Sequence, residues 1–515
     1  VYIFSIIAFF ILLIACINYM NLSTARSTLR AREIGIRKAV GAQRKEIISQ
    51  FLSESVLLAW IASILAIVLT WTMIPWLNRI SGQQLSINIL WKWQILLPLA
   101  LVPFVTGIIS GIYPALFMSS FKPVTVLKGL FKSGGINISF RKVLVTLQFA
   151  ISIILIISTA VVFKQMNYMQ KRSLGFDREH IVTLPYTPEL NDNFDAFRTE
   201  LLLNSNIRNA GRSSRIPTGR LLDAMGARIM KGDSLAPVNA NIKFVSADQD
   251  FITTYGVKVV AGRGFSKDYS LDTSAFLVNE AAVSTLGFHS NEEVIGKDFG
   301  YGNRLGKIIG VIHDFHFESL HQRIVPLVLL VPRSAFSYSR ISVKIAGADM
   351  PAALGHIEKT WKKFLPDTPY EYTFLDENFS RLYDAETKQR TLFTTFACLA
   401  ILIACLGLFG LSAFAISQRI KEIGIRKVLG ADVSTIVMLL SRDFMKLVII
   451  SALIAIPVAG IFMNKWLQDF AYRTKLPWWI FLVALGLAAL IAFVTISFQA
   501  IKAAVANPVR SLRTE

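Results

Sequence analysis

The residues of this chain that most clearly carry chemistry form a charged decapeptide, E-I-G-I-R-K-x-x-G-A, which occurs at Glu33–Ala42 and again at Glu422–Ala431. In each copy the glutamate precedes the arginine by four residues, so that the two side chains pair on one helix face and stabilise it by about 0.2–0.5 kcal/mol. The Arg-Lys pair near the end suits the negative end of the helix dipole. The glycine that follows is a typical helix terminator. Each copy therefore predicts a short, capped, charged helix.

Repetition of the whole pattern favours a docking surface for another protein. A basic helix that only sets membrane orientation is the alternative, but any mixture of Lys and Arg would satisfy it. Orientation alone does not require the same Ile, Gly and Glu positions twice, whereas exposed ordered segments commonly carry function. The predicted docking residues are Glu33, Ile34, Gly35, Ile36, Arg37, Lys38 and Gly41 within 32–42, and Glu422, Ile423, Gly424, Ile425, Arg426, Lys427 and Gly430 within 421–431.

The repeat extends upstream at a constant offset of 389 positions. Ile14-Ala15-Cys16 corresponds to Ile403-Ala404-Cys405, Leu22-Ser23 to Leu411-Ser412, and Arg30 to Arg419. The ends of the two halves also match, since Lys122–Lys128 resembles Asn507–Arg513 around a Pro-Val pair. Such segments suit a short helix along the anionic inner leaflet, or simply a stop with basic charge.

The elements that position these motifs are membrane spans. The chain has 515 residues, of which 53% are hydrophobic and 17% charged, against about 25% charged in soluble domains. A span takes roughly 20 apolar residues, and the chain offers seven such segments. They are about 2–22, 51–77, 94–118, 143–163, 391–417, 444–464 and 478–500.

The net charge of +20 gives the orientation. The polar block 164–390 carries a net charge of only +2, so the basic excess lies beside the spans, which indicates membrane topology and not nucleic-acid binding. Loops 23–49, 119–142 and 418–443 are the most basic and are predicted to be cytoplasmic. The block 164–390 is then extracytoplasmic, in a multi-pass protein of the bacterial inner membrane.

Four regions follow from the spans and the repeat. They are a first repeat of three helices at 1–142 with the docking helix 32–42, a single span at 143–163, an extracytoplasmic domain at 164–390, and a second repeat of three helices at 391–515 with the docking helix 421–431. The second repeat is preceded by a helix and a domain that the first lacks. We therefore expect this sequence to be an N-terminally truncated piece of a chain with eight spans and two such domains.

The fold class expected is an α-helical membrane protein with an inserted α/β domain. Within that domain, β-rich runs predict strands at 181–184, 276–278, 307–312 and 325–331, and polar periodic runs predict helices at 193–204, 279–286 and 351–364. Polar, helix-compatible segments at 164–171 and 376–390 are expected to extend the adjoining spans as a stalk.

No segment of the chain predicts an ATPase or another enzyme. The nearest approach to a phosphate-binding loop is 301–308, with Tyr301 in place of the first Gly and Ile308 in place of the Ser or Thr that would hold Mg²⁺. The spans carry almost no ionisable groups, which counts against a proton-coupled transporter. We predict no cofactor or catalytic residue, and ATP would have to be bound by a partner.

One dense cluster of histidines allows the alternative interpretation of a metal site. His313, His316, Glu318 and His321 are residue types that bind zinc, but their spacing matches no strong zinc pattern. We favour a structural turn and predict no metal site. Cys16, Cys398 and Cys405 all lie in apolar segments, where small packing residues are the simplest interpretation.

The decapeptide is similar to the cytoplasmic coupling region of the MacB/FtsX-type ABC transporter permeases. Further motifs look like the MacB-type periplasmic core domain, and the two-repeat form looks most like permeases common in Bacteroidetes. The motifs are Leu174-Gly175-Phe176-Asp177, Gly262-Arg263-x-Phe265, Val278-Asn279-Glu280, Leu286-Gly287 and Val311-Ile312-x-Asp314-Phe315-His316-Phe317-x-Ser319-Leu320.

This resemblance implies the permease subunit of a mechanotransmission-type ABC system. A cytoplasmic ABC ATPase dimer would dock on the two helices, and its motion would move the periplasmic domain to export a peptide, antibiotic or lipoprotein-like substrate. A periplasmic adaptor and an outer-membrane channel are then optional partners. The alternatives are an FtsX-like regulator of cell-wall hydrolases and a membrane sensor of peptides or antibiotics that does not transport.

Overall fold

The computed structural model describes residues 2–27, 30–81, 92–120, 136–231, 234–347 and 349–505, together with Gln84, Ser86 and Asn88. The chain forms two compact units, which are a helical unit of Val1–Gln165, Thr387–Trp466 and Lys475–Glu515, and an α/β unit of Met166–Glu386 and Leu467–Thr474. The repeated segments Lys122–Lys128 and Asn507–Arg513 lie outside the described residues.

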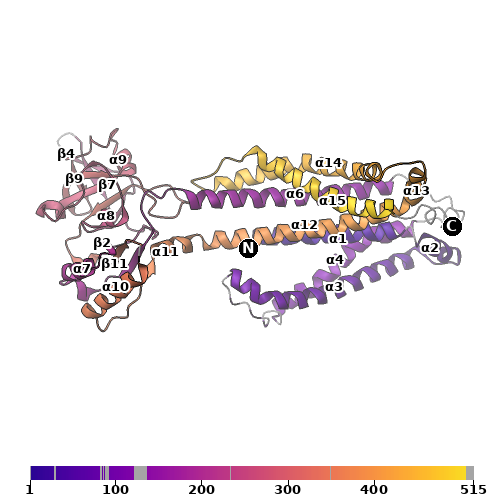
Figure 1. Cartoon of the computed structure of the whole chain (residues 1–515), viewed down its shortest axis with the longest axis horizontal. Helices are drawn as coiled ribbons and strands as arrows, with labels where there is room; N and C mark the ends of the chain where they lie inside the picture. Colours follow the sequence, from indigo (N-terminus) through magenta and orange to yellow (C-terminus); the bar gives the residue numbers. More distant parts are fainter. Residues whose placement is uncertain are drawn as a thin grey trace. The chain divides into compact units, whose positions relative to one another are not determined.

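The helical unit consists of long apolar helices and two short polar ones (Figure 1). They are α1 (Tyr2–Ser27), α2 (Ala31–Ala39), α3 (Arg44–Ser81), α4 (Trp93–Ser119), α6 (Ile136–Lys171), α12 (Asp384–Gln418), α13 (Ile420–Val428), α14 (Val433–Gln468) and α15 (Trp478–Val505). Within the described residues, seven are long and apolar enough to cross a membrane, which confirms the seven predicted spans.

Helix is the expected form for these segments because a single span can satisfy its backbone hydrogen bonds in lipid only internally. Prolines, which would break a soluble helix, are tolerated in such spans because neighbouring groups satisfy the freed backbone carbonyls. Pro98, Pro103 and Pro114 lie inside α4, and Pro457 lies inside α14. The helices α6 and α12 are each longer than their span. The first continues to Lys171, as predicted for 164–171. The second begins only at Asp384, and Leu375–Leu382 forms a separate helix, so the extension predicted for 376–390 is continuous with the span only from Asp384.

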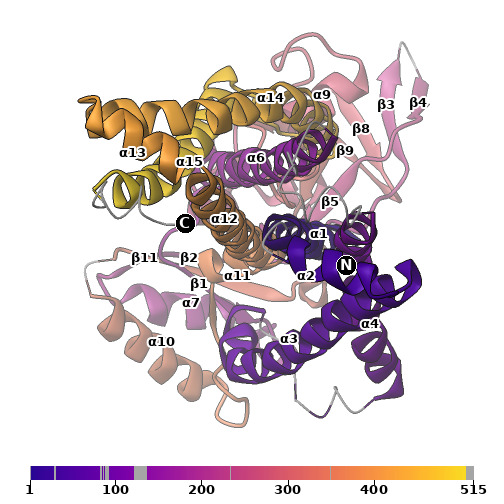
Figure 2. The same ribbon diagram turned by 90° about the vertical axis from the view of Figure 1, so that its right-hand side faces the viewer.

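The helical unit has a core where α1, α6 and α12 meet, around Ile7, Ile14, Ile151 and Ala400. Figure 2 shows α1, α6 and α12 as neighbours in the helical unit. The amide of Asn18 in α1 donates to the carbonyl oxygen of Ile403 in α12 at 2.6 Å. Gln148 of α6 donates to the carbonyl oxygen of Ala404 at 3.1 Å.

One position in this core accepts only glycine. A Cβ at Gly407 would lie 1.9 Å from Oδ1 of Asn18, so the side chain of Asn18 occupies the space that Gly407 leaves. Asn18 and Gly407 occupy equivalent positions of the two repeats, because they are separated by the repeat offset. The helices α1 and α12 therefore cross at short distance. The two repeats contribute different residues to this crossing, an asparagine from α1 and a glycine from α12.

The α/β unit follows α6 and precedes α12 in the chain. Its elements are β1 (Ile181–Pro185), η2 (Pro188–Leu190), α7 (Phe194–Leu202), β2 (Ile207–Ser213), β3 (Ala227–Lys231), β4 (Ser234–Val238), β5 (Lys243–Ser246), α8 (Phe251–Tyr255), β6 (Val259–Gly262), η3 (Ser270–Ser274), β7 (Ala275–Asn279), α9 (Glu280–Leu286), β8 (Asp298–Tyr301), β9 (Arg304–Ile312), β10 (Leu327–Leu330), η4 (Ala335–Ser337), β11 (Arg340–Ile345), α10 (Met350–Phe364), β12 (Thr373–Phe374) and α11 (Leu375–Leu382). The strands and helices predicted in this region are confirmed by β1, β7, β9, β10, α7, α9 and α10.

Two sheets organise the unit. The smaller has the order β12-β1-β11-β2, and its pairs are antiparallel. The larger has the order β4-β3-β8-β9-β7-β10-β5, with β6 paired to β9. Its pairs β7–β9 and β10–β5 are parallel, whereas the others are antiparallel. The fold is thus a helical membrane protein with an inserted α/β domain, as predicted.

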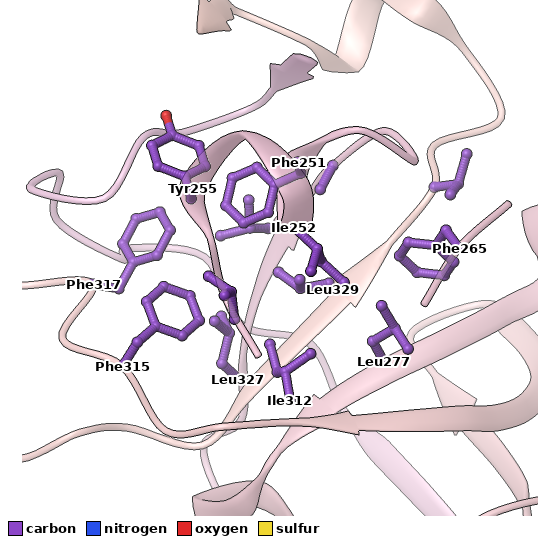
Figure 3. Packing of buried hydrophobic residues seen from close by; sticks show 14 of the residues in the cluster. Phe251, Ile252, Tyr255, Phe265, Leu277, Ile312, Phe315, Phe317, Leu327 and Leu329 are labelled. Carbon is purple, nitrogen blue, oxygen red and sulfur yellow. The ribbon is translucent and has the colours of Figure 1, made fainter. Parts of the chain in front are cut away.

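An aromatic and aliphatic core joins the larger sheet to the helix α8. Leu277, Ile312 and Leu329 of the sheet pack with Phe251 and Tyr255 of α8 (Figure 3). A second core lies under the smaller sheet, where Phe197 of α7 and Trp361 of α10 are fully buried. The strands β7 and β10 are buried along their whole length, so the unit has a core of its own.

Candidate docking site

The first copy of the decapeptide forms α2. Glu33 and Arg37 pair through Oε1 and Nη2 at 2.6 Å, which is the predicted contact one turn apart. The helix ends at Ala39, and Gly41 follows with φ of +108°. No heavy atom would lie within 4 Å of a Cβ at Gly41, so a side chain would have space there. Glycine is favoured at this position because of its positive φ.

One face of α2 is anchored in the helical unit. Ile34 is 3% exposed and packs with Ile47 and Phe51 of α3 and Ala115 of α4. We call these three partner residues the first socket. Because an isolated nine-residue helix is marginal in water, this contact is what holds α2 in place.

The second copy forms α13 and repeats the arrangement. Glu422 Oε1 and Arg426 Nη2 lie 2.9 Å apart, and Gly430 follows the helix with φ of +90°. Ile423 is 5% exposed and packs with Ile436 and Leu440 of α14 and Ala504 of α15, the second socket. Each socket residue of the second repeat lies at the repeat offset from its counterpart in the first.

A further ion pair is repeated beside each helix. Arg30, which precedes α2, pairs with Glu54 at 3.0 Å, and Arg419, which precedes α13, pairs with Asp443 at 3.6 Å. The sequence identified Arg30 and Arg419 as equivalent but did not identify the sockets or these carboxylates as partners. A comparison of the two repeats at the same offset downstream of the decapeptide would have identified the socket residues and the two carboxylates as equivalent.

The opposite face of each helix is exposed. Ile36 and Ile425 are 54% and 51% exposed, and the exposed Val40 and Leu429 lie after them. The Glu–Arg pairs border these apolar side chains, and α2 and α13 lie at the same end of the helical unit (Figure 1). Gly35 and Gly424 are buried, so the predicted docking residues divide into anchoring and exposed ones.

The two helices differ in the contacts of their basic residues. Lys38 donates to the carbonyl oxygen of Ser119 at 2.5 Å, and Arg37 donates to Oε1 of Gln50 at 2.9 Å. Partial burial, with a smaller contribution from the charge of Arg44, lowers the pKa of Lys38. The residue equivalent to Gln50 is Leu439, which offers no acceptor in its side chain.

The motifs of the α/β unit have structural roles. Arg263 donates to both carboxylate oxygens of Asp272 at 2.8 Å. Asn279 caps α9 by accepting from the backbone N–H of Ala282 at 3.0 Å, and Gly175 lies where a Cβ would be 2.9 Å from Cα of Phe315. These contacts fix turns of the α/β unit.

The four members of the histidine cluster turn to different partners. His313 Nδ1 lies 2.7 Å from Oε2 of Glu280, and Glu318 accepts from the backbone N–H of Leu221 at 2.6 Å. His321 Nδ1 lies 2.8 Å from Oγ of Ser319. Among the described residues no three potential ligands gather as a metal site. The side chains of His313, Glu318 and His321 are each held by a contact within the α/β unit.

His316 of this cluster contacts a part of the chain that sequence reasoning left as a loop. Its ring lies 4.8 Å from that of Tyr472, and the guanidinium of Arg172 lies 4.0 Å from the Tyr472 ring. Burial, with the charge of Arg172 adding to it, lowers the pKa of His316 to about 4. The segment Leu467–Thr474, which links α14 to α15, thus belongs to the α/β unit.

The segment that resembles a phosphate-binding loop is a hairpin. Residues 301–308 connect β8 to β9, with Tyr301 paired to Arg304 across the turn. A phosphate-binding loop joins a strand to a helix whose N–H groups face the phosphates, so this segment has a different geometry.

Comparison with known proteins agrees with the repeat. A family model described as FtsX-like permease C-terminal matches residues 5–123 and residues 394–508. The "Uncharacterized ABC transporter permease YknZ" of Bacillus subtilis (strain 168) is 34% identical over 117 residues, 23% of this chain and 28% of that protein. The "Macrolide export ATP-binding/permease protein MacB" of Bartonella quintana (strain Toulouse) is 29% identical over 210 residues, 39% of this chain and 31% of that protein.

A solved structure is similar to part of the chain. It is the periplasmic region of MacB from Actinobacillus actinomycetemcomitans, at 14% identity and a TM-score of 0.29, covering 42% of this chain and 97% of that structure. The two sequence relatives above are matched over less than a third of their own length.

Each of the two matched regions contains one socketed helix with its neighbouring spans. The chain therefore carries an FtsX-like permease domain at both ends, and it is similar to ABC transporter permeases of the MacB type. In the part of the chain that the structure describes, seven helices are long and apolar enough to cross a membrane, as in a multi-pass protein of the bacterial inner membrane. The basic loops place the α/β unit on the periplasmic side.

Proposed function

We propose that α2 and α13 are coupling helices on which a cytoplasmic ABC ATPase dimer docks. The single observation that carries the proposal is that both helices anchor one isoleucine in equivalent sockets and expose a second. An exposed isoleucine beside a Glu–Arg pair offers a partner an apolar contact with a polar rim, the usual anatomy of an interface. One chain then supplies a docking helix to each ATPase subunit.

In this proposal, ATP-driven closure of the ATPase moves the two helices together. Ile34 and Ile423 transmit the motion to α3, α4, α14 and α15 through the sockets. The uninterrupted helices α6 and α12 carry it toward the α/β unit, and the segment Leu467–Thr474 provides a further covalent connection. The work done is conformational, with ATP bound by the partner and no cofactor in this chain.

Export of a peptide, antibiotic or lipoprotein-like substrate is the activity we propose for this motion. The MacB relatives are named for macrolide export, which supports export as the class of activity. A periplasmic adaptor and an outer-membrane channel complete the proposed export route.

Cross-linking in the full chain tests the docking. Arg37→Cys and Arg426→Cys, introduced singly after Cys16, Cys398 and Cys405 are replaced by Ala, are expected to form adducts with a protein that a photoreactive ATP analogue labels. Arg79→Cys lies between the second and third predicted spans, and therefore on the opposite side of the membrane from loops 23–49 and 119–142; it is the control and should give none. Absence of a labelled adduct at both Arg37 and Arg426 would contradict the proposal.

Export is tested separately by accumulation of labelled peptide antibiotics in cells with and without the chain. Lower accumulation with the chain is expected. A labelled cross-link with unchanged accumulation would favour the alternatives, in which the same motion regulates a cell-wall hydrolase or a sensor.

A further inference from the structure

A cavity of about 150 Å³ lies within the helical unit beside the second coupling helix. Its walls come from α6, α12, α14 and α15 and from Arg419, the residue before α13. Because α13 is on the predicted cytoplasmic side, the cavity lies at the level of the inner leaflet. Its volume is smaller than the roughly 300–1,000 Å³ of pockets that enclose a drug-sized molecule, so it suits one chemical group of a larger ligand.

The charges of the lining are unequal. Arg141, Lys142 and Arg419 face it, against the single carboxylate of Asp443, whose distance to Arg419 is 3.6 Å. The Nε of Arg141 is buried and has no hydrogen-bond partner among the described residues. The carbon atom Cζ of this guanidinium lies 5.9 Å from the ring centroid of Phe414. A buried donor without an acceptor costs about 1–3 kcal/mol, which an anionic ligand would offset.

The rest of the lining is apolar. It is formed by Val145, Leu411, Leu440, Leu447 and Ile496, and by Ala415, Ile416 and Phe444. A guanidinium donates in a planar fork that matches two phosphate oxygens. The site thus combines a phosphate-binding end with a wall suited to hydrocarbon.

We propose that this cavity binds the phosphate of an anionic glycerophospholipid from the inner leaflet, with an acyl chain along the apolar wall. Basic pockets between spans on the cytoplasmic side are suited to anionic headgroups. Since Arg419 directly precedes α13, the bound lipid braces the second coupling helix. The closer Arg30–Glu54 pair, at 3.0 Å, performs this task beside α2. The binding itself does not depend on the proposed docking of an ATPase.

Lipid retention by the purified full chain tests the inference. The chain is reconstituted in nanodiscs of phosphatidylethanolamine with one quarter phosphatidylglycerol, extracted into mild detergent, and its retained lipids are counted by native mass spectrometry. Wild type is expected to retain phosphatidylglycerol selectively, and Arg141→Gln/Arg419→Gln to retain roughly tenfold less, as loss of charge-assisted hydrogen bonds predicts. The matched control Arg30→Gln/Lys45→Gln removes the same charge elsewhere and should retain it as wild type does.

Two further arms complete the experiment. Arg141→Lys keeps the positive charge but lacks the planar guanidinium, so it should retain an amount of phosphatidylglycerol between those of wild type and the double variant. This conservative substitution distinguishes loss of the lipid site from misfolding of the double variant. Inorganic phosphate alone should not displace the lipid, because it lacks the acyl chain. Equal retention by all variants, or displacement of the lipid by inorganic phosphate, overturns the proposal.

Discussion

The two coupling helices share their anchors but not their surroundings. Ile34 and Ile423 lie in sockets built from equivalent residues, whereas Arg37 of α2 donates to Gln50, whose equivalent Leu439 has no acceptor in its side chain. Beside α13 lies instead the cavity with Arg141. The comparison teaches which contacts a coupling helix requires and which each repeat has acquired on its own. Position depends on the shared apolar anchors, and local charge differs between repeats.

Replacing an anchor should have the largest effect. Ile34→Asp or Ile423→Asp places a carboxylate in an apolar socket, at a cost of about 3 kcal/mol or more. Hydrogen exchange of the mutated helix is expected to accelerate roughly a hundredfold, while the other coupling helix keeps its protection. Ile36→Asp and Ile425→Asp, on the exposed faces, are the controls and should change exchange less than about twofold. Loss of protection in both helices from one substitution would show that the sockets are not independent.

The second-largest loss of stability is expected from a substitution where α1 crosses α12. Gly407→Ala inserts a methyl group 1.9 Å from Asn18 Oδ1 and should destabilise the chain by about 1–3 kcal/mol, read as a lower melting temperature in detergent. Asn18→Ala/Gly407→Ala removes the collision and should recover part of that loss. If the double variant is no more stable than Gly407→Ala, the crossing does not depend on this pair.

The terminal glycines should behave alike in the two repeats. Gly41→Ala and Gly430→Ala each force a side chain into a positive-φ conformation, which costs about 1–2 kcal/mol. Because neither position is crowded, the two effects are expected to agree in size when exchange of the preceding helix is measured. Asn tolerates such conformations better than Ala, so Gly41→Asn should cost less. If the substitution destabilises the preceding helix strongly at only one of the two glycines, the two helix ends are not equivalent.

The repeated ion pairs should give the smallest effect. Glu54→Gln and Asp443→Asn are each expected to change stability by less than about 1 kcal/mol, because both pairs are largely exposed. The effect should be greater for Glu54, whose distance to Arg30 is shorter, and it should fall with added salt. Thermal unfolding at low and high salt measures both. A larger effect at Asp443 would reverse the expected ranking.

Sequence reasoning anticipated the elements better than their tertiary partners. Apolar length was sufficient for the seven spans, and the Glu–Arg spacing with a terminal glycine was sufficient for α2 and α13. The helices end at Ala39 and Val428, just before the predicted limits, because the Gly turns begin there. The boundaries of the four predicted regions and the docking role remain predictions.

What escaped prediction depends on contacts between distant residues. The sockets join α2 to α3 and α4, and no local pattern marks Ala115 or Ala504 as partners of an isoleucine. The segment Leu467–Thr474 reads as a plain loop, yet Phe470 and Tyr472 contact His321 and His316. Sheet order likewise follows from pairing across the whole unit, with β12 beside β1.

The contact of Asn18 with Gly407 has a consequence for how this architecture can evolve. A symmetric homodimer places identical residues at both equivalent positions of an interface. Two asparagines would compete for the space that only one occupies here, and two glycines would lose the hydrogen bond to the carbonyl oxygen of Ile403. A single duplicated chain can fix a different amino acid in each copy. Gene fusion thereby opens a combination that no pair of identical subunits can reach.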